Sequence, residues 1–390
     1  MLAIQYLEDS PDIDAIAPEQ ARARLRVAFE RLPLEVVILG WRLPPALWRA
    51  CAEEVARADA RLYRWHPLLA GDATFPPRPG WRVIGPDGEP VSAFRGLPEF
   101  TFICPNRPAV REVALDRLYR AIRGQGYQGV FLDRIRYPSP AADPARLLAC
   151  FCEDCGRAAA AEGLDLEAAR REIQTLPPAE LARALLDPQA PAPAVVRAFL
   201  DFRTRSVTRF VQSAADVART EGLAVGLDCF SPALTHLVGQ DLAALDPCCE
   251  WIKVMTYGHS LGPAGLPFEL LDLAGWLTER AAMDEAGALR SLSRAAHVPL
   301  PASRSALEEG GLTPEALAGE VRRARAAGVR TLLAGMELVR LEGVTRLSEP
   351  QIAADLEAFG VAGADGLALS WDLWHMPLEW LALVGRVWPG

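Results

Sequence analysis

Gly129-Val-Phe-Leu-Asp133 is the stretch that decides the fold, because it is a short apolar run that ends in an acidic residue and follows a segment of helical period over 108–123. The same alternation of a short apolar run with a longer helical segment recurs along the chain, which indicates β-α units and a parallel sheet. The expected strands are 3–7, 36–40, 62–65, 129–132, 224–227, 251–255, 331–334 and 366–369. Eight such units predict an α/β fold of the closed (β/α)₈ TIM barrel type.

The segments between these runs have the period of amphipathic helices, and several carry a proline in the first turn, where a missing N–H has no cost. Helices are expected at 18–32, 45–58, 108–123, 192–220, 238–246, 267–282, 313–328 and 350–359, with a closing helix over 376–388. The run His297-Val-Pro-Leu-Pro301 is expected to be a loop, because its prolines would remove hydrogen-bond donors from a strand that pairs on both sides.

The pattern predicts a single barrel domain over 1–390 with two long connections, 70–107 and 138–191. The first is rich in proline and glycine, and the second is a helical excursion that contains a cluster of cysteines. Both leave the C-terminal ends of strands, so they are expected to fold over the mouth of the barrel.

Composition and charge limit the class of protein and of ligand. Of the 390 residues, 51% are hydrophobic and 23% are charged, which supports a packed core and excludes wholesale disorder. The formal charge of −9 at pH 7 opposes binding to nucleic acid or to an anionic membrane, since phosphates require a basic surface. No apolar run reaches the ~18 residues that cross a bilayer, and Met1–Asp9 lacks the basic residues of a signal peptide. We therefore expect a cytoplasmic protein, or a secreted one if a signal has been removed; its oligomeric state is not indicated.

Acidic residues mark the C-terminal ends of the expected strands, where the active site of a TIM barrel lies. They are Glu8 and Asp9 after the first run, Asp133 after the fourth, Asp228 after the fifth, Glu337 after the seventh and Asp372 after the eighth. Each by itself is as well explained as a helix cap or a partner of arginine. As a set, their mutual repulsion would raise the pKa of at least one carboxyl group, as acid–base catalysis requires.

Aromatic residues and histidines gather at the same strand ends. They are Trp41, Trp65, His66, Tyr137, Tyr257, His259, Trp371 and Trp374. Flat rings beside carboxylates are typical of a sugar site, although aromatic residues also simply fill barrel mouths. There is no His-x-His or His-Glu-x-x-His pattern, which argues against a metal hydrolase.

Four motifs carry a resemblance to a known family. They are Gln128-Gly-Val-Phe-Leu-Asp133-Arg-Ile-Arg136-Tyr-Pro138, Cys104-Pro-Asn-Arg-Pro-Ala-Val-Arg111, Trp251-Ile-Lys-Val-Met-Thr-Tyr257-Gly-His259 and Gly366-Leu-Ala-Leu-Ser-Trp371. In this order they resemble segments of bacterial glycosyl hydrolase TIM barrels, distant relatives of the alpha-amylase superfamily. The resemblance implies a glycoside hydrolase with a carbohydrate substrate and with Asp133 as the catalytic carboxylate of the fourth strand.

Glycoside cleavage requires a second carboxyl group beside the first. We expect Glu337, on a strand nearly opposite Asp133, to be the acid/base, with Asp228 as the second choice. Arg134, Arg136 and Lys253 are expected to keep carboxylates ionised or to bind substrate oxygens. The other expected substrate-binding residues are Trp41, Trp65, His66, Tyr257, His259, Trp371 and Asp372.

Lys253 suggests an alternative, because the other basic residues among the 41 are all arginine. Strand alternation places Lys253 on the same face as Met255 and Tyr257, and a desolvated lysine there could form a Schiff base, as in aldolases or lyases built on a barrel. A third hypothesis is a non-catalytic carbohydrate-binding barrel, which would keep the aromatic residues without a working carboxylate pair.

The cluster Cys150-Phe-Cys152-Glu-Asp-Cys155 places three thiols at metal-ligand spacing. Cys104 or the pair Cys248-Cys249 would have to complete a structural zinc site, since zinc takes four ligands. Buried free thiols are the other interpretation. No cofactor is expected for catalysis.

Overall fold

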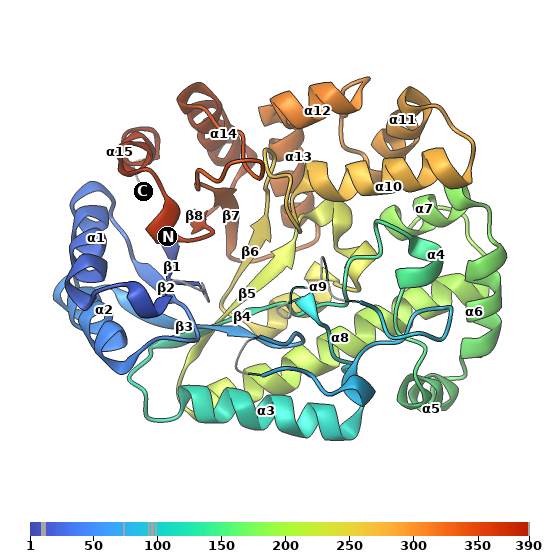
Figure 1. Ribbon diagram of the computed structural model, residues 1–390, viewed down its shortest axis with the longest axis horizontal. Helices are drawn as coiled ribbons and strands as arrows, with labels where there is room; N and C mark the ends of the chain where they lie inside the picture. Colours follow the sequence, from blue (N-terminus) through green and yellow to red (C-terminus); the bar gives the residue numbers. More distant parts are fainter. Residues whose placement is uncertain (9–12, 73–74, 93, 95–96, 98–99, 389–390) are drawn as a thin grey trace.

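The computed structural model describes residues 1–8, 13–72, 75–92, 94, 97 and 100–388, and its centre is a closed barrel of parallel strands (Figure 1). Asp9 lies outside the described residues. The strands are β1 Leu2–Tyr6, β2 Val36–Leu39, β3 Arg61–Pro67, β4 Gly129–Asp133, β5 Ala224–Phe230, β6 Trp251–Met255, β7 Leu332–Glu337 and β8 Gly366–Ser370. Each pairs in parallel with its neighbours in chain order, and β8 closes the barrel on β1. The predicted (β/α)₈ barrel is therefore confirmed.

Helices surround the barrel on its outer side (Figure 1). Those close to the expected positions are α1 Pro18–Arg31, α2 Pro45–Arg57, α3 Pro108–Ile122, α8 Ala194–Thr220, α10 Leu266–Arg280, α13 Pro314–Ala326, α14 Glu349–Ala362 and α15 Leu378–Val387. The expectation of a single helix over 238–246 was wrong. The one-turn α-helix α9, Leu242–Leu245, forms there, between the 3₁₀ helices His236–Val238 and Asp246–Cys248. Gly239 has a left-handed backbone conformation with φ of 76°, and Asp241 is the N-cap of α9. The residues before Gly239 and those after Asp241 therefore cannot belong to one continuous helix.

Two helices in the connection from β6 to β7 were not expected. They are α11, Glu285–Ala296, and α12, Arg304–Gly310. The run from His297 to Pro301 between them is not a strand, as predicted.

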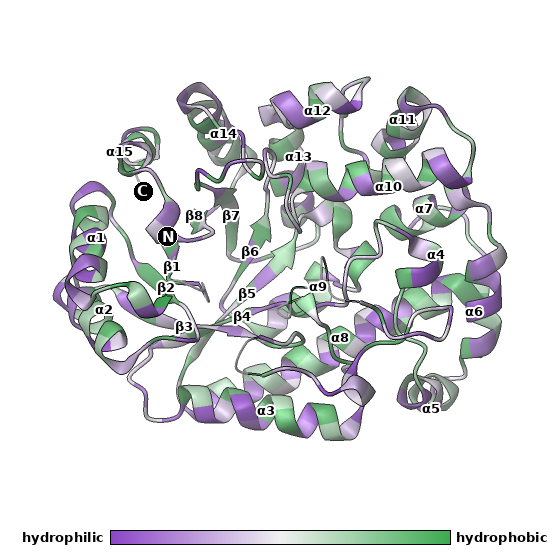
Figure 2. Ribbon diagram, viewed as in Figure 1, coloured by the Kyte–Doolittle hydropathy of each residue, from purple (hydrophilic) through white to green (hydrophobic). Residues whose placement is uncertain are grey.

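Large rings fill the interior of the barrel where neighbouring strands carry glycine. A Cβ on Gly129 would lie 2.4 Å from the ring of Tyr63, and one on Gly226 would lie 2.2 Å from the ring of Trp251. Trp251 also stacks on Phe131, with ring centroids 5.3 Å apart. The outward-facing residues of the strands form the larger core with the helices, and inward-facing residues form a smaller one. Figure 2 shows hydrophobic residues along β6.

The two long connections leave β3 and β4 on the same side of the barrel. The second contains α4 Pro144–Leu147, α5 Glu153–Ala161, α6 Leu166–Thr175 and α7 Pro178–Leu186. Its first part, 138–147, contributes to a cavity beside the barrel mouth. Farther along, α6 packs against α8, and α7 packs against α10 and α11, so this part of the excursion covers the side of the barrel (Figure 1).

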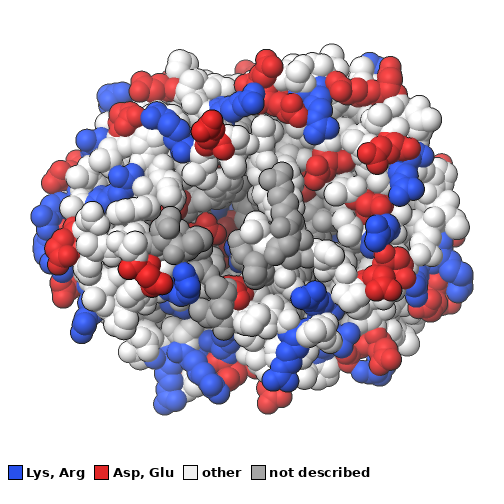
Figure 3. Space-filling model, in the orientation of Figure 1, with Lys and Arg blue, Asp and Glu red and all other residues white. Residues whose placement is uncertain are grey.

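None of the helices within the described residues combines the length and apolar character that crossing a membrane requires. On the face drawn in Figure 3, positive and negative side chains are interspersed. The described residues on that face form no continuous basic surface of the kind that binds phosphates.

Candidate active site

A cavity of about 360 Å³ opens at the C-terminal ends of the strands, a size within the range of small-molecule sites. Its charged lining residues are Glu8, Asp133, Arg134, Arg136 and Asp228. Its aromatic lining residues are Trp65, Phe94, Phe100, Tyr257 and Trp371. Carboxylates, arginines and rings from strands and loops far apart in the sequence thus share one cavity.

Asp133 is the last residue of β4, and its carboxylate is held in a defined orientation. Its Oδ2 accepts a hydrogen bond of 3.0 Å from Trp65 Nε1, and its Oδ1 accepts one from the backbone N–H of Arg134. Arg134 has a positive φ of 52°, so the chain turns sharply directly after the acid. This turn lets Asp133 end the strand while its carboxylate faces the cavity.

Asp228 lies within β5 and not after it, because β5 continues to Phe230. Burial, together with repulsion from Asp133, raises the pKa of Asp228 to about 7, although the Lys253 ammonium acts in the opposite direction. Oδ2 of Asp228 accepts a hydrogen bond of 3.1 Å from Lys253 Nζ. For Oδ1, no hydrogen-bond partner exists among the residues that the structure describes.

Lys253 is completely buried beneath the cavity and is not part of its lining. Besides Asp228, its Nζ donates a hydrogen bond of 2.9 Å to Gln5 Oε1 and lies 5.2 Å from the centroid of the Tyr257 ring. A Cβ on Gly335 would come within 2.7 Å of the Lys253 Cε atom, so the glycine in β7 leaves room for the lysine stem. Lys253 therefore lies buried beside the carboxylate of Asp228.

Arg134 and Arg136 supply positive charge to the other side of the cavity. Burial lowers the pKa of Arg136 to about 10, which leaves its guanidinium charged at neutral pH. Arg134 lies 5.3 Å from the centroid of the Trp41 ring, and Arg136 lies 4.4 Å from that of Phe230. Within the described part of the chain, Nη1 of Arg134 and Nε of Arg136 have no hydrogen-bond partner. Unpaired buried donors and acceptors in one cavity are suited to a ligand rich in hydroxyl groups.

Glu337 ends β7 but is not among the residues that line the cavity. Its Oε1 accepts a hydrogen bond of 2.6 Å from the backbone N–H of His259, and burial raises its pKa to about 7. The Nε2 atom of His259 lies 2.8 Å from Asp355 Oδ2, and this carboxyl partner helps to raise the pKa of the imidazole. Glu337, His259 and Asp355 therefore form a buried network behind the wall of the cavity.

Three further expected substrate-binding residues also lie outside the cavity lining. Trp41 packs edge-on against Trp65, with centroids 5.4 Å apart, and supports it from behind. His66 is buried within β3, where desolvation lowers its pKa well below the usual value. Asp372 accepts hydrogen bonds from the backbone N–H groups of Leu7, Glu8 and Trp374, so its carboxylate joins the ends of β1 and β8.

Sequence reasoning missed several lining residues. Gln5 carried a usable signal, because it is the one polar side chain within β1. Phe94 and Phe100 come from the connection after β3, where no periodicity marks them, and Val344 comes from the loop after β7. Glu8 was noted as a strand-end acid, but no role was assigned to it.

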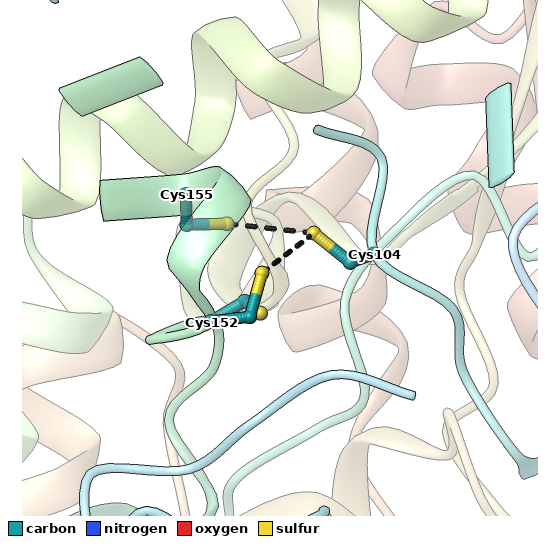
Figure 4. Close-up of side chains that lie close together, drawn as sticks. Cys104, Cys152 and Cys155 are labelled. Carbon is teal, nitrogen blue, oxygen red and sulfur yellow. Dashed lines mark hydrogen bonds between the residues drawn. The ribbon is translucent and has the colours of Figure 1, made fainter. Parts of the chain in front are cut away.

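The predicted cysteine cluster does come together, with Cys104 as its fourth member (Figure 4). One sulfur atom from each of Cys104, Cys150, Cys152 and Cys155 lies within 4.8 Å of all the others, and all four residues are buried. Such a group could hold a structural metal ion. Cys248 and Cys249 belong elsewhere, near the start of β6.

Solved glycoside hydrolase domains share this fold. The PgaB (BpsB) glycoside hydrolase domain from Bordetella bronchiseptica aligns with a TM-score of 0.58 at 13% identity, over 98% of this chain and 97% of the other. The beta-galactosidases of Halorubrum lacusprofundi and Marinomonas ef1 align with TM-scores of 0.57 and 0.58 at 14% and 12% identity. These alignments cover 97% and 99% of this chain and 55% and 59% of the two beta-galactosidases. The chain therefore spans a little over half the length of each beta-galactosidase. No family model and no curated protein matches the sequence. The likeness is therefore one of fold, a (β/α)₈ barrel shared with glycoside hydrolases.

Proposed function

We propose that this protein is a glycoside hydrolase, with Asp133 and Asp228 as its pair of catalytic carboxyl groups. The observation that carries the proposal is that both acids, on neighbouring strands, line one cavity, and that the pKa of one is raised to about 7. Leu132 and Leu227 are register partners in β4 and β5, and each acid is the next residue along its strand. Glycoside cleavage uses one carboxylate and one protonated carboxyl group in such proximity.

Asp228 is suited to the role of general acid. With a pKa near 7 its carboxyl group retains a proton in mildly acidic solution, and Lys253 holds Oδ2, so that Oδ1 remains available for the leaving oxygen. Asp133, oriented by two N–H donors, then attacks the anomeric carbon as the glycosidic C–O bond breaks and the proton passes to the leaving alcohol. Water next attacks the glycosyl-enzyme and gives its proton to Asp228. The neighbouring strand positions favour this retaining route over inversion, which needs room for a water molecule between the acids.

The rest of the lining supports a carbohydrate substrate. Trp65, Tyr257 and Trp371 offer flat faces to the C–H groups of a sugar ring. Arg134 and Arg136 carry N–H groups that have no partner among the described residues and that can donate hydrogen bonds to sugar hydroxyl oxygens. The neighbours with the same fold include enzymes named for β-galactoside and α-L-fucoside hydrolysis, so these glycosides belong in a substrate screen.

The geometry bears on both alternatives to this assignment. Glu337 also has a raised pKa, but it accepts the His259 N–H behind the cavity wall, so we assign it to holding that wall. A Schiff-base role for Lys253 requires a free amine that reaches the substrate, whereas Lys253 is fully buried and donates to Gln5 and Asp228.

A screen against chromogenic and natural α- and β-glycosides tests the proposal. We expect wild-type turnover that falls above about pH 7, as Asp228 loses its proton. Asp133→Asn and Asp228→Asn should each lower kcat by roughly 10²–10⁴. Glu337→Gln should keep most of the activity, and Asp116→Asn on the exposed face of α3 should match wild type. If wild type and Asp133→Asn both bind carbohydrate and neither turns over any glycoside, the protein is a non-catalytic carbohydrate-binding barrel.

Asp228→Asn needs a stability control because, above about pH 7 where Asp228 is ionised, the substitution leaves the buried Lys253 ammonium without its counter-charge. Removal of one partner of a buried pair costs about 3–5 kcal/mol. The double variant Asp228→Asn/Lys253→Met removes both charges and should recover most of that stability while remaining inactive. Recovery of activity in the double variant would exclude Asp228 as the acid.

A further inference from the structure

The four-cysteine cluster lies away from the carboxylates and joins the two long connections. Cys104 lies at the end of the connection that follows β3 and precedes α3. Cys150, Cys152 and Cys155 come from the excursion after β4, with Cys152 as the N-cap of α5 and Cys155 in its first turn. The ligands thus come from segments about fifty residues apart, which pack together only in the folded chain.

The spacing of the sulfur atoms fits a tetrahedral metal and not a disulfide. Cys104 Sγ lies 3.4 Å from Cys155 Sγ and 3.6 Å from Cys152 Sγ (Figure 4). A disulfide would require about 2.05 Å, whereas four thiolates at ~2.3 Å from one zinc ion lie ~3.8 Å from each other. We infer that Cys104, Cys150, Cys152 and Cys155 bind one Zn²⁺ ion as a closed structural site.

The surroundings of the cluster are those that thiolates require. The backbone N–H of Ile84 points at Cys150 Sγ at 3.4 Å, and the Asn106 side-chain amide donates to Cys155 Sγ at 3.4 Å. The N-terminal end of α5 adds its partial positive charge. The Arg107 side chain, which pairs with Asp154 of α5 at 3.7 Å, places a cation nearby. These N–H donors and charges offset the negative charge of a metal with four thiolates.

The other cysteines show what an ordinary buried thiol looks like in this protein. Cys248 Sγ donates to Gln212 Oε1, Cys249 Sγ donates to backbone carbonyl groups, and Cys51 is a buried residue of α2. The part of the chain that the structure describes contains no second group of three or more metal-ligating side chains of this kind. These isolated thiols provide matched controls.

Zinc at this position would hold one wall of the cavity in place. The connection that ends at Cys104 also carries Phe94 and Phe100, and the segment that leads to Cys150 begins with Arg134 and Arg136. The two segments meet again where Phe151 donates its N–H to Ile84 O at 2.9 Å. Four protein ligands leave no open coordination position, so the ion is structural and takes no part in the reaction.

Metal analysis of the full-length protein, purified after growth with zinc, is the first test. We expect about one equivalent of zinc per chain, and cobalt in its place should give the absorption of a tetrahedral tetrathiolate site. Cys104→Ser and Cys155→Ser should each lower the zinc content to below about a tenth of an equivalent, whereas Cys51→Ser and Cys248→Ser should keep it. Absence of zinc from the wild type, iron in its place, or equal loss in the control variants would overturn the inference.

A second measurement remains decisive if the serine variants do not fold. Hydrogen exchange of the wild-type protein, with zinc and after its removal by a chelator, should show faster exchange over 79–92, 100–104 and 144–161 and little change in the barrel strands. Unchanged exchange in both segments would show that no metal holds them. This result does not depend on glycosidase activity, so failure here and failure of the proposed function are separate outcomes.

Discussion

Lys253 has a physical reason to be lysine in a chain whose other basic residues are arginine. Its amine makes two hydrogen bonds, to Gln5 and to Asp228, in a completely buried position. Gly335 makes room for its stem, and the rings of Phe131 and Tyr257 lie 5.5 Å and 5.2 Å from its Nζ. A compact ammonium fits this space, and a planar guanidinium does not.

We therefore predict that Lys253→Met lowers turnover and that Lys253→Arg does not restore it. Loss of the positive charge removes the interaction that lowers the pKa of Asp228, so the alkaline limb of the pH–rate profile should move to higher pH in Lys253→Met. Misplacement of the charge by about an ångström should cost on the order of 100-fold in kcat for Lys253→Arg. Steady-state kinetics from about pH 5 to 9 provide the measurement.

Two results would contradict this account of Lys253. Wild-type kinetics in Lys253→Arg would mean that any positive charge suffices. Inactivation by borohydride in the presence of a carbonyl compound, with added mass on Lys253, would instead support the Schiff-base alternative.

At the scale of elements, the long helix α8 anchors the excursion to the barrel through Arg203. This side chain is fully buried, donates to the carbonyl oxygens of Ala149 at 2.6 Å and Leu237 at 3.1 Å, and lies 5.0 Å from the centroid of the Tyr137 ring. Ala149 directly precedes Cys150 of the cluster. One guanidinium thus connects α8, the cysteine segment and the loop after β5.

We predict that Arg203→Met destabilises the fold by about 2–4 kcal/mol, because it leaves two buried carbonyl groups without their donor. Arg205→Met in the same helix is the matched control. Arg205 is half exposed and pairs with Glu162 at the surface, so its loss should change stability by about 1 kcal/mol or less. Urea denaturation of both variants provides the measurement. Equal unfolding midpoints for Arg203→Met and Arg205→Met would show that Arg203 does not anchor the excursion.

At the scale of the whole molecule, buried carboxyl groups make stability depend on pH in an unusual direction. Burial raises the pKa of Asp228, Glu269, Glu320, Glu337, Asp355 and Asp372. These carboxyl groups therefore keep protons in the folded state that the unfolded chain has already released, and their contribution to stability falls as the pH rises from about 4 to about 7. The raised pKa of His259 acts in the same sense above pH ~6.5, since the folded state also binds that proton more tightly. The lowered pKa values of His66 and His236 act in the opposite sense, but these histidines are fewer than the six carboxyl groups.

Urea unfolding at pH 5 and pH 7.5 should thus show a lower free energy of unfolding at the higher pH, by on the order of 1 kcal/mol for each contributing group. Glu337→Gln removes one such group and should reduce the difference. Asp116→Asn, which changes an exposed acid, should leave it unchanged. A wild-type protein that becomes more stable between these pH values would contradict the burial of these groups in their protonated form.

The sequence by itself determined the barrel, because strands buried on both faces become short apolar runs that can be recognised without knowledge of their neighbours. It also determined which acids come near the mouth, since every strand of a parallel barrel ends on the same side. It did not reveal α11 and α12, because these helices lie between α10 and α13, the two helices expected in the connection from β6 to β7, and the barrel pattern does not require them.

Only the tertiary structure decided which of these residues share a space. Asp228 and Glu337 both lie on strands near the C-terminal end of the barrel. β5 continues to Phe230, and its register on β4 and β6 places Asp228 beside Lys253 at the cavity. The Glu337 carboxyl group instead accepts a hydrogen bond from the backbone N–H of His259. In the same way, Cys104 and the pair Cys248-Cys249 were equal candidates for the cysteine cluster, and the packing of the β3 connection on the excursion selected Cys104. The physical reason is common to both cases. Local sequence determines which way a strand runs and which residues it buries, whereas contacts between residues far apart in the chain depend on register and on loop packing, which no local pattern encodes.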